Sequence, residues 1–215
     1  AKKALSTFGR VDVLVNNGGV TTRSMARNSD IEVDGYVANV DYLSYVALAK
    51  SLLPSWEDRA DGSDRPIVIN TSSVSGKISL PVRTAYCGAK FAIHGWFDAF
   101  RLEQVMVGHP VNVLNVVLGS TKTNVARNAV VESPDVRFGD TDENIEGGLD
   151  PSFVAERVLA SAYAGIKELW IARPKELLSL YLNRYIPETF SNIVGRTMMK
   201  QYAVEKGKEL SEGEL

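Results

Sequence analysis

The sequence predicts an α/β fold, a Rossmann-like doubly wound parallel sheet with helices on both faces. Apolar runs of strand length alternate with longer helical segments, which is typical of βα units. A length of 215 residues with 45% hydrophobic content is enough to bury one sizeable core. Because no internal repeat or linker marks a second domain, we expect a single domain over residues 1–215.

The first elements are a helix, a strand and a second helix. Residues 1–7 are helical in character but begin without a Met or an N-cap residue, which indicates a fragment that starts inside a helix. Val11–Asn16 is the first strand, closed by Gly18 and Gly19. A helix is expected over Tyr36–Leu53, and we expect it to end before Pro54 because proline disrupts a helix interior.

The remaining elements continue the alternation of strands and helices. A polar loop over residues 57–65 precedes them, and residues 174–215 are expected to form a C-terminal helical extension. The expected elements are, in chain order, the strand Ile67–Thr71, the helix Thr84–Val107, the strand Val111–Leu118, the helix Pro151–Ala164 and the strand Leu169–Ala172.

Composition excludes several classes of function. The 24 basic and 26 acidic residues leave a net charge of -2, which gives no basic surface for nucleic acid. The single Cys87 cannot form an internal disulfide or a cysteine metal site. His94 and His109 are too far apart for helical ligand spacing, so we expect no metal. No apolar run is long enough to span a bilayer, and no signal peptide is recognisable.

Tyr86 and Lys90 are the strongest candidates for chemistry. They stand four residues apart near the start of the expected long helix, so both lie on one helical face. A phenol ordinarily has a pKa near 10, and a fixed ammonium beside it favours the phenolate. The pair therefore has the chemistry of a general acid/base, although the Tyr-x-x-x-Lys spacing also arises by chance.

Ser73 follows the strand Ile67–Thr71, where side chains project beyond the carboxyl end of the sheet. A hydroxyl group there can donate to a substrate carbonyl oxygen and hold it against the phenol. The alternative is a serine-rich turn that satisfies its own backbone. That alternative would explain Ser72 and Ser75 equally well.

Taken together, these motifs resemble the classical short-chain dehydrogenase/reductase family. Four signatures occur in the family's order and spacing between Phe8 and Ala172. They are Asn16-Asn17-Gly18-Gly19, which is similar to Asn-Asn-Ala-Gly; Asn39 in the following helix; Ser73 thirteen residues before Tyr86, with Lys90; and Gly119 with Thr121 and Thr123. Two residues depart from the pattern, since Gly18 replaces an Ala and Leu118 replaces a Pro.

The resemblance implies an oxidoreductase that interconverts a carbonyl and a secondary alcohol with NADP or NAD. It implies that Tyr86 is the general acid/base, that Lys90 supports it and binds the nicotinamide ribose, that Ser73 orients the substrate, and that Asn39 holds a water. The cofactor side would be lined by Asn17, Gly18, Tyr86, Lys90, Gly119, Thr121 and Thr123. The same Tyr-x-x-x-Lys pair also occurs in nucleotide-sugar epimerases and dehydratases, but the short region after Tyr86 favours the classical branch.

The local sequences at Ser44–Lys50 and Gly76–Pro81 are similar to those of the hydroxysteroid- and retinol-dehydrogenase-like branch of the family. This implies a lipophilic substrate and a homodimer of the intact protein through the long helix. The branch includes enzymes anchored to the endoplasmic reticulum, so that membrane and the cytoplasm are both open as locations. The segment Leu177–Tyr185 could contact a membrane surface, or it could close the substrate pocket or the dimer.

The family's glycine-rich pyrophosphate turn is missing. None of the seventeen glycines stand at positions i and i+2, so we expect these 215 residues to bind a dinucleotide weakly. The sequence is consistent with an N-terminally truncated piece of an ordinary enzyme, with an inactive short isoform that acts as an interaction module, or with a divergent complete protein. The loop 132–150, with seven acids and one base, is either a solvated loop or a substrate loop over the active site.

Overall fold

The computed structural model describes residues 1–58 and 65–205, with backbone only for 200–205. The polar loop expected over 57–65 lies largely outside the described residues. The chain divides into two compact units, Ala1–Arg173 and Pro174–Leu215. The boundary falls at Pro174, where the sequence places the start of the helical extension. A single domain over 1–215 stays a prediction.

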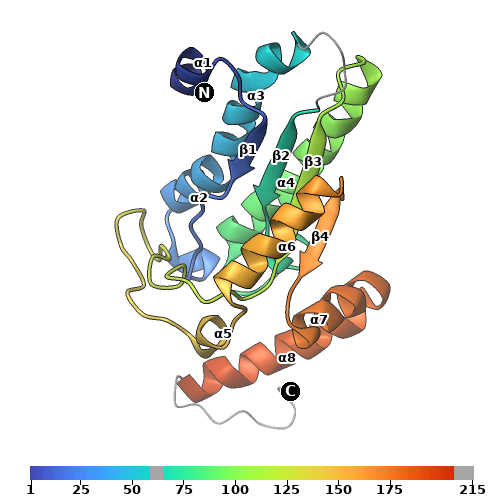
Figure 1. Ribbon diagram of the computed structural model, residues 1–215. Coiled ribbons are helices and arrows are strands. Elements are labelled where there is room, and N and C mark those ends of the chain that lie inside the picture. The colour runs from blue at the N-terminus through green and yellow to red at the C-terminus, as the bar shows by residue number, and fades with distance from the viewer. Residues whose placement is uncertain (59–64, 206–215) are drawn as a thin grey trace. The chain divides into compact units, whose positions relative to one another are not determined.

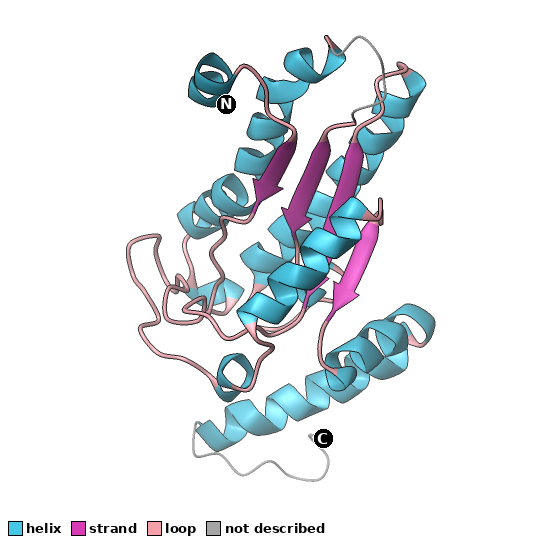
Figure 2. Ribbon diagram, viewed as in Figure 1, coloured by secondary structure: helices cyan, strands magenta, loops and turns pink. Residues whose placement is uncertain are grey.

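Four parallel strands form the sheet of unit 1 (Figure 2). They are β1 (Val13–Asn16), β2 (Ile67–Thr71), β3 (Asn112–Leu118) and β4 (Glu168–Ile171), in the spatial order β1-β2-β3-β4. Each strand begins within two residues of the position that the apolar runs indicate, and β2 has the expected bounds. The predicted α/β fold with a parallel sheet is confirmed.

Helices connect the strands. They are α1 (Lys2–Phe8), α2 (Ile31–Ala38), α3 (Ser44–Glu57), α4 (Thr84–Met106), α5 (Glu143–Glu146), α6 (Pro151–Tyr163), α7 (Pro174–Tyr185) and α8 (Pro187–Glu205), with the short turns η1 (Ala26–Asn28), η2 (Asn39–Leu43) and η3 (Val74–Gly76). The helix expected to stop before Pro54 runs on to Glu57. One missing backbone donor is tolerated because the last turn is anchored by Trp56, whose indole donates to the Val11 carbonyl over 2.9 Å.

The two faces of the sheet are covered by different helices (Figure 1). One face packs against α3 and α4 through a buried cluster that includes Leu14, Val68, Leu52 and Phe97. The other packs against α6 through a cluster that includes Ile69 and Val154. Burial of a large aliphatic or aromatic side chain contributes about 1.5–3 kcal/mol, so both helix layers stabilise the sheet. The arrangement is doubly wound.

On β1, the face toward the α6 side is uncovered within the described residues. Val13 and Val15 are 46% and 54% exposed, although their neighbours in register on β2 are Ile67 and Ile69. Ile69 by contrast is 1% exposed. The same strand therefore buries Leu14 on one side and leaves two valines open to solvent on the other.

A chain of buried polar side chains crosses the sheet. Asn16, Asn70 and Asn115 stand in register on β1, β2 and β3. The Asn16 amide donates to Asn70 over 2.8 Å, the Asn70 amide to Asn115 over 3.0 Å, and the Asn115 amide to Asp98 of α4 over 3.1 Å. Buried amides are costly unless paired, so this ladder specifies the register of the three strands and fixes α4 against them.

Unit 2 consists of α7 and α8. Both helices begin with a proline, Pro174 and Pro187, a residue well suited to the first helical turn. Tyr181, Tyr185 and Ile186 expose much of their surface. Within the described residues, no helix combines the length and the apolarity that crossing a bilayer requires.

Candidate active site

Tyr86 and Lys90 lie in the first two turns of α4, on one face of the helix, as their spacing predicts. The Lys90 Nζ is 5.5 Å from the centroid of the Tyr86 ring. It donates a hydrogen bond to the carbonyl of Thr71, at the end of β2, over 2.9 Å. The Lys90 side chain is buried while Tyr86 is half-buried, so an enclosed ammonium stands beside a phenol that solvent can still reach.

Asp41 is a second buried charge at this position. It lies in η2, a π-helical turn between α2 and α3, and its Oδ2 is 3.1 Å from the Lys90 Nζ. Its Oδ1 accepts the backbone N–H of Val20 over 2.7 Å. A Cβ on Gly19 would lie 3.3 Å from Asp41 Oδ2, so the glycine after β1 lets the backbone approach the ion pair closely.

The environment acts on the two partners differently. Burial raises the pKa of Asp41, and the Lys90 charge and the Val20 N–H oppose that shift. Burial alone would lower the pKa of Lys90, but the charges of Tyr86, Asp41 and Tyr45 outweigh it and raise the pKa of the ammonium. Lys90 is therefore held as a cation, 5.5 Å from the centroid of the Tyr86 ring.

Asn39 is not brought into this cluster. Its side chain is exposed, while Asp41, two residues later, lies against Lys90. The role that the resemblance implies for Asn39, holding a water, stays a prediction, and the acidic side chain that the structure places against Lys90 is Asp41. A π-turn accommodates an extra residue, which changes the helix face that follows it. The helical period alone could not have identified Asp41.

Ser73 lies where the sequence places it, just beyond the carboxyl end of β2. Its hydroxyl oxygen accepts the N–H of Ser75 over 3.1 Å and caps η3, so the turn-forming alternative describes one of its interactions. The hydroxyl proton is left to donate. Gly76 brings this turn against α4, since a Cβ there would lie 2.8 Å from the Lys90 carbonyl.

Asn17 and Gly18 form the exposed end of β1. The hydroxyl of Thr71 donates to Asn17 Oδ1 over 2.9 Å, and the phenol of Tyr45 donates to the Gly18 carbonyl over 2.8 Å. A Cβ on Gly18 would meet nothing within 4 Å. This strand end therefore offers an open surface next to the Lys90 cluster.

Gly119, Thr121 and Thr123 form the turn that follows β3, at the same edge of the sheet. The Gly119 N–H donates to the Ile171 carbonyl over 2.9 Å, which ties the turn to β4. Thr121 is buried and Thr123 is exposed. A Cβ on Gly148 would lie 2.6 Å from the Ser120 carbonyl, so that glycine lets the returning end of the loop 132–150 pack onto this turn.

The loop 132–150 is held at several points rather than being solvated throughout. Arg23 donates to Asp142, which caps α5, over 2.9 Å. On the other side of α5, Arg173 donates to the Gly147 carbonyl over 3.1 Å. Val130, two residues before the loop, donates its N–H to the Thr21 carbonyl over 2.9 Å. These contacts place the loop beside the segment that follows β1 (Figure 1).

The residues at the sheet edge fit the nicotinamide ribose end of a dinucleotide. Lys90 donates one of its three N–H groups to the Thr71 carbonyl and forms an ion pair with Asp41, so donor capacity remains for a ligand. The open space at Gly18 permits a close approach of a ligand. The pyrophosphate end has no matching glycine-rich turn within these 215 residues.

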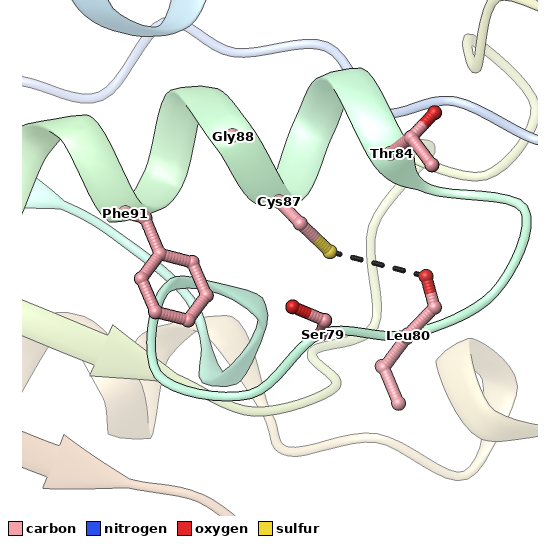
Figure 3. Close-up of a pocket in the computed structure, with 6 residues that line it drawn as sticks. All are labelled: Ser79, Leu80, Thr84, Cys87, Gly88 and Phe91. Carbon is pink, nitrogen blue, oxygen red and sulfur yellow. Dashed lines mark hydrogen bonds between the residues drawn. The ribbon is translucent and has the colours of Figure 1, made fainter. Parts of the chain in front are cut away.

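A separate cavity of about 290 Å³ lies on another side of α4 (Figure 3). Its lining consists of Ser79, Leu80, Thr84, Cys87, Gly88 and Phe91. Tyr86, Lys90 and Ser73 are not among these residues. The Cys87 Sγ lies 4.0 Å from the Leu80 carbonyl, and the side chain is buried, which agrees with a packing role for this cysteine.

A second cluster joins α4 to β4. His94, Asp98 and Glu168 place possible ligand atoms within 4.8 Å of one another, a convergence that the sequence did not reveal. Lys77 lies 2.7 Å from Glu168, and Arg101 lies 2.9 Å from Asp98. Because both carboxylates already contact a cation, this cluster resembles an ion-pair network more than a metal site.

Comparisons with known proteins identify the family of this chain. A family model described as short chain dehydrogenase matches residues 1–133. The chain is 36% identical over 201 residues to dehydrogenase/reductase SDR family member 7B of Xenopus laevis, covering 94% of this chain and 60% of that protein. The chain thus spans about 60% of the length of the curated relatives that head the comparison.

Solved structures share the fold. A short-chain dehydrogenase from Streptomyces avermitilis matches with a TM-score of 0.67 and 22% identity, covering 96% of this chain and 74% of that one. A short chain dehydrogenase from Burkholderia cenocepacia, solved in complex with NADP, matches with a TM-score of 0.69 and 18% identity, covering 89% and 72%. At these identities the likeness concerns the fold.

Proposed function

Because this chain belongs to the short-chain dehydrogenase family, we propose that it carries the catalytic residues of an NAD(P)(H)-dependent oxidoreductase that interconverts a carbonyl and a secondary alcohol. The observation that carries the proposal is the pairing of a half-buried phenol with a buried ammonium at the carboxyl end of a parallel sheet. The Lys90 Nζ lies 5.5 Å from the Tyr86 ring centroid. Such strand ends are where α/β folds bind their ligands.

In the reductive direction, Tyr86 donates its phenolic proton to the carbonyl oxygen while the carbonyl carbon gains a hydride. In the oxidative direction, the phenolate takes the hydroxyl proton back. Lys90 stabilises the phenolate through its charge, and Ser73 donates its hydroxyl proton to the same substrate oxygen. Proton transfer by a positioned side chain contributes about 10²–10⁴-fold to a rate.

Asp41 is the residue that positions Lys90 in this proposal. It forms an ion pair with Lys90 and is itself fixed by the Val20 N–H, which holds the ammonium beside Tyr86. Asn39 remains a proposed site residue only through its sequence resemblance. Its exposed position leaves a water-mediated contact as the one route by which it could take part.

The nicotinamide cofactor, when bound, supplies or accepts the hydride. Lys90, with its remaining donor, and Tyr86 would hold the ribose, and Asn17 and Gly18 would line the surface beside it. Gly119, Thr121 and Thr123 would contact the nicotinamide side. The Burkholderia relative holds NADP, which supports NADP or NAD here without choosing between them.

We further propose a lipophilic carbonyl or alcohol as the substrate, because the sequences at Ser44–Lys50 and Gly76–Pro81 are similar to the hydroxysteroid- and retinol-dehydrogenase-like branch. A homodimer through α4 and a membrane-surface contact by the exposed aromatic residues of α7, Tyr181 and Tyr185, belong to the same proposal. The catalytically silent interaction module is the competing function. The observation that favours it is the lack of a Gly-x-Gly turn among these 215 residues, since the family binds pyrophosphate there.

The test is a fluorescence titration of NADH and NADPH against the 215-residue chain and against a version expressed with the coding sequence upstream of residue 1. We expect weak binding by the short chain, and tight binding with carbonyl turnover by the longer one. Tyr86→Phe should lower turnover at least about 100-fold with little change in cofactor affinity. Tyr163→Phe, at an exposed position in α6, is the matched control.

Two outcomes would contradict the proposal. If neither version binds a nicotinamide cofactor, the oxidoreductase assignment fails and the interaction module becomes the leading function. If Tyr86→Phe turns over the carbonyl at the normal rate, the proton comes from another group. Tight cofactor binding by the short chain would show that the glycine-rich turn is dispensable.

A further inference from the structure

Two arginines and one carboxylate form a second charged group near the start of α4. Arg23 lies in the segment after β1, Arg83 directly precedes α4, and Asp142 caps α5 in the loop 132–150. The Arg23 guanidinium donates to Asp142 over 2.9 Å, and 9% of the Arg23 side chain is exposed. The proposed proton transfer uses none of these three residues.

Backbone strain and hydrogen bonds hold Arg83 against the segment that carries Arg23. Val82 has a φ of 57°, in the left-handed region that a β-branched residue rarely adopts. Its carbonyl accepts the N–H of Ser24 over 3.1 Å and the hydroxyl of Thr22 over 3.4 Å. Such strain persists only where the surroundings impose it. The fold therefore fixes the position of the backbone from which the Arg83 side chain extends.

This group carries an excess of positive charge. Among the described residues, Asp142 pairs with Arg23, and none forms an ion pair with Arg83. Burial, and then the charge of Arg23, lower the pKa of Arg83. Burial would raise the pKa of Asp142, but its hydrogen bonds and the charges of both arginines hold that pKa below its usual value. One carboxylate, Asp142, thus lies near two guanidinium groups and pairs with one of them.

The excess charge lies next to the reacting group. Arg83 directly precedes α4, whose first turn carries Tyr86. The charge of Tyr86 is among the influences on the Arg83 guanidinium. An anion held at Arg83 would therefore belong to a molecule that also reaches the phenol.

We propose that Arg23 and Arg83 bind a carboxylate or phosphate group of the carbonyl substrate, and that Asp142 is the internal counter-ion that this group displaces. The planar guanidinium donors match both kinds of anion in a bidentate manner. The assignment rests on the proposed function for the identity of the ligand as substrate. Anion binding itself requires no turnover and can be measured separately.

The experiment is calorimetric titration of the 215-residue chain with hexanoate and with butyl phosphate, using hexanamide as the neutral match. We expect both anions to bind and hexanamide not to bind. Asp142→Asn should tighten anion binding about tenfold because an internal competitor is lost, and Arg83→Met should weaken it about tenfold or more. Arg83→Lys should retain part of the affinity. Arg157→Met, on the exposed surface of α6, removes the same charge elsewhere and should change nothing.

Equal affinities for the wild type, Arg83→Met and Asp142→Asn would overturn the proposal, and so would equal binding of hexanamide. Displacement of the anion by NADPH would overturn it as well, since the arginines would then serve the cofactor. The gain expected for Asp142→Asn cannot arise from unfolding, so a misfolded Arg83→Met leaves the test intact. Anion binding together with no nicotinamide binding by either version of the chain would contradict the proposed function alone.

Discussion

Two lysine–carboxylate pairs of unit 1 have the same chemistry and opposite surroundings. Lys90 and Asp41 lie 3.1 Å apart with side chains 4% and 0% exposed, whereas Lys77 and Glu168 lie 2.7 Å apart with side chains 27% and 30% exposed. Burial raises the pKa of Asp41. Burial would also raise the pKa of Glu168, but hydrogen bonds from His94, Lys77 and Trp170 prevail and lower it to about 2.

The difference shows that separation alone does not decide what an ion pair does. A half-exposed pair keeps its hydration and contributes little to stability. A buried pair loses hydration on both ions and is rarely the most stable solution for a protein core. For the buried pair we propose a functional role, the placement of a cation beside Tyr86. The half-exposed pair links the residue after η3 to β4, which is a structural role.

The largest difference between the two pairs is expected in the free energy of unfolding, when one partner of the buried pair is deleted. Asp41→Ala leaves the Lys90 ammonium buried without its carboxylate, and we expect a loss of about 3–5 kcal/mol in the free energy of unfolding. The matched change Glu168→Ala should cost less, because water can reach the Lys77 ammonium that is left behind. Urea unfolding of both variants measures the difference. Equal losses would mean that burial does not set the value of these pairs.

A milder change tests the electrostatic role of the buried pair. Asp41→Asn keeps an oxygen for the Val20 N–H but removes the charge that raises the pKa of Lys90. The pKa of Lys90 should then fall, and the basic limb of the pH profile of kcat/KM should move to lower pH by about one unit. The measurement uses the cofactor-competent version of the protein.

Asn39→Ala is the control for that experiment. Because Asn39 is exposed, its replacement should leave the pH profile within error of the wild type. A shift for Asn39→Ala with none for Asp41→Asn would restore Asn39 as the site residue that the sequence resemblance implies.

The smallest effect is expected at the half-exposed pair, and it depends on pH. The pKa of Glu168 is lowered from 4.5 to about 2, so the carboxylate stabilises the folded state above pH 4.5. That contribution is lost as the pH falls from there toward 2. Glu168→Gln should flatten the fall of Tm over this window, because its amide does not titrate there. Glu156→Gln, on the exposed face of α6, should follow the wild-type curve.

The sequence by itself determined the local features. Alternating apolar runs predicted four strands, and the 3.6-residue period placed Tyr86 and Lys90 on one face of α4. Both features depend on neighbours within a few positions of the chain. Ser73 was placed at the end of β2 for the same reason.

Only the tertiary structure decided which distant residues meet these groups. The π-turn η2 sets Asp41 rather than Asn39 against Lys90, and the strained Val82 fixes Arg83 near Arg23. Helix α3 also continues past Pro54 because Trp56 is anchored to Val11, far away in sequence. These choices depend on the burial of charges and polar groups between elements, and no local period of the sequence encodes such burial.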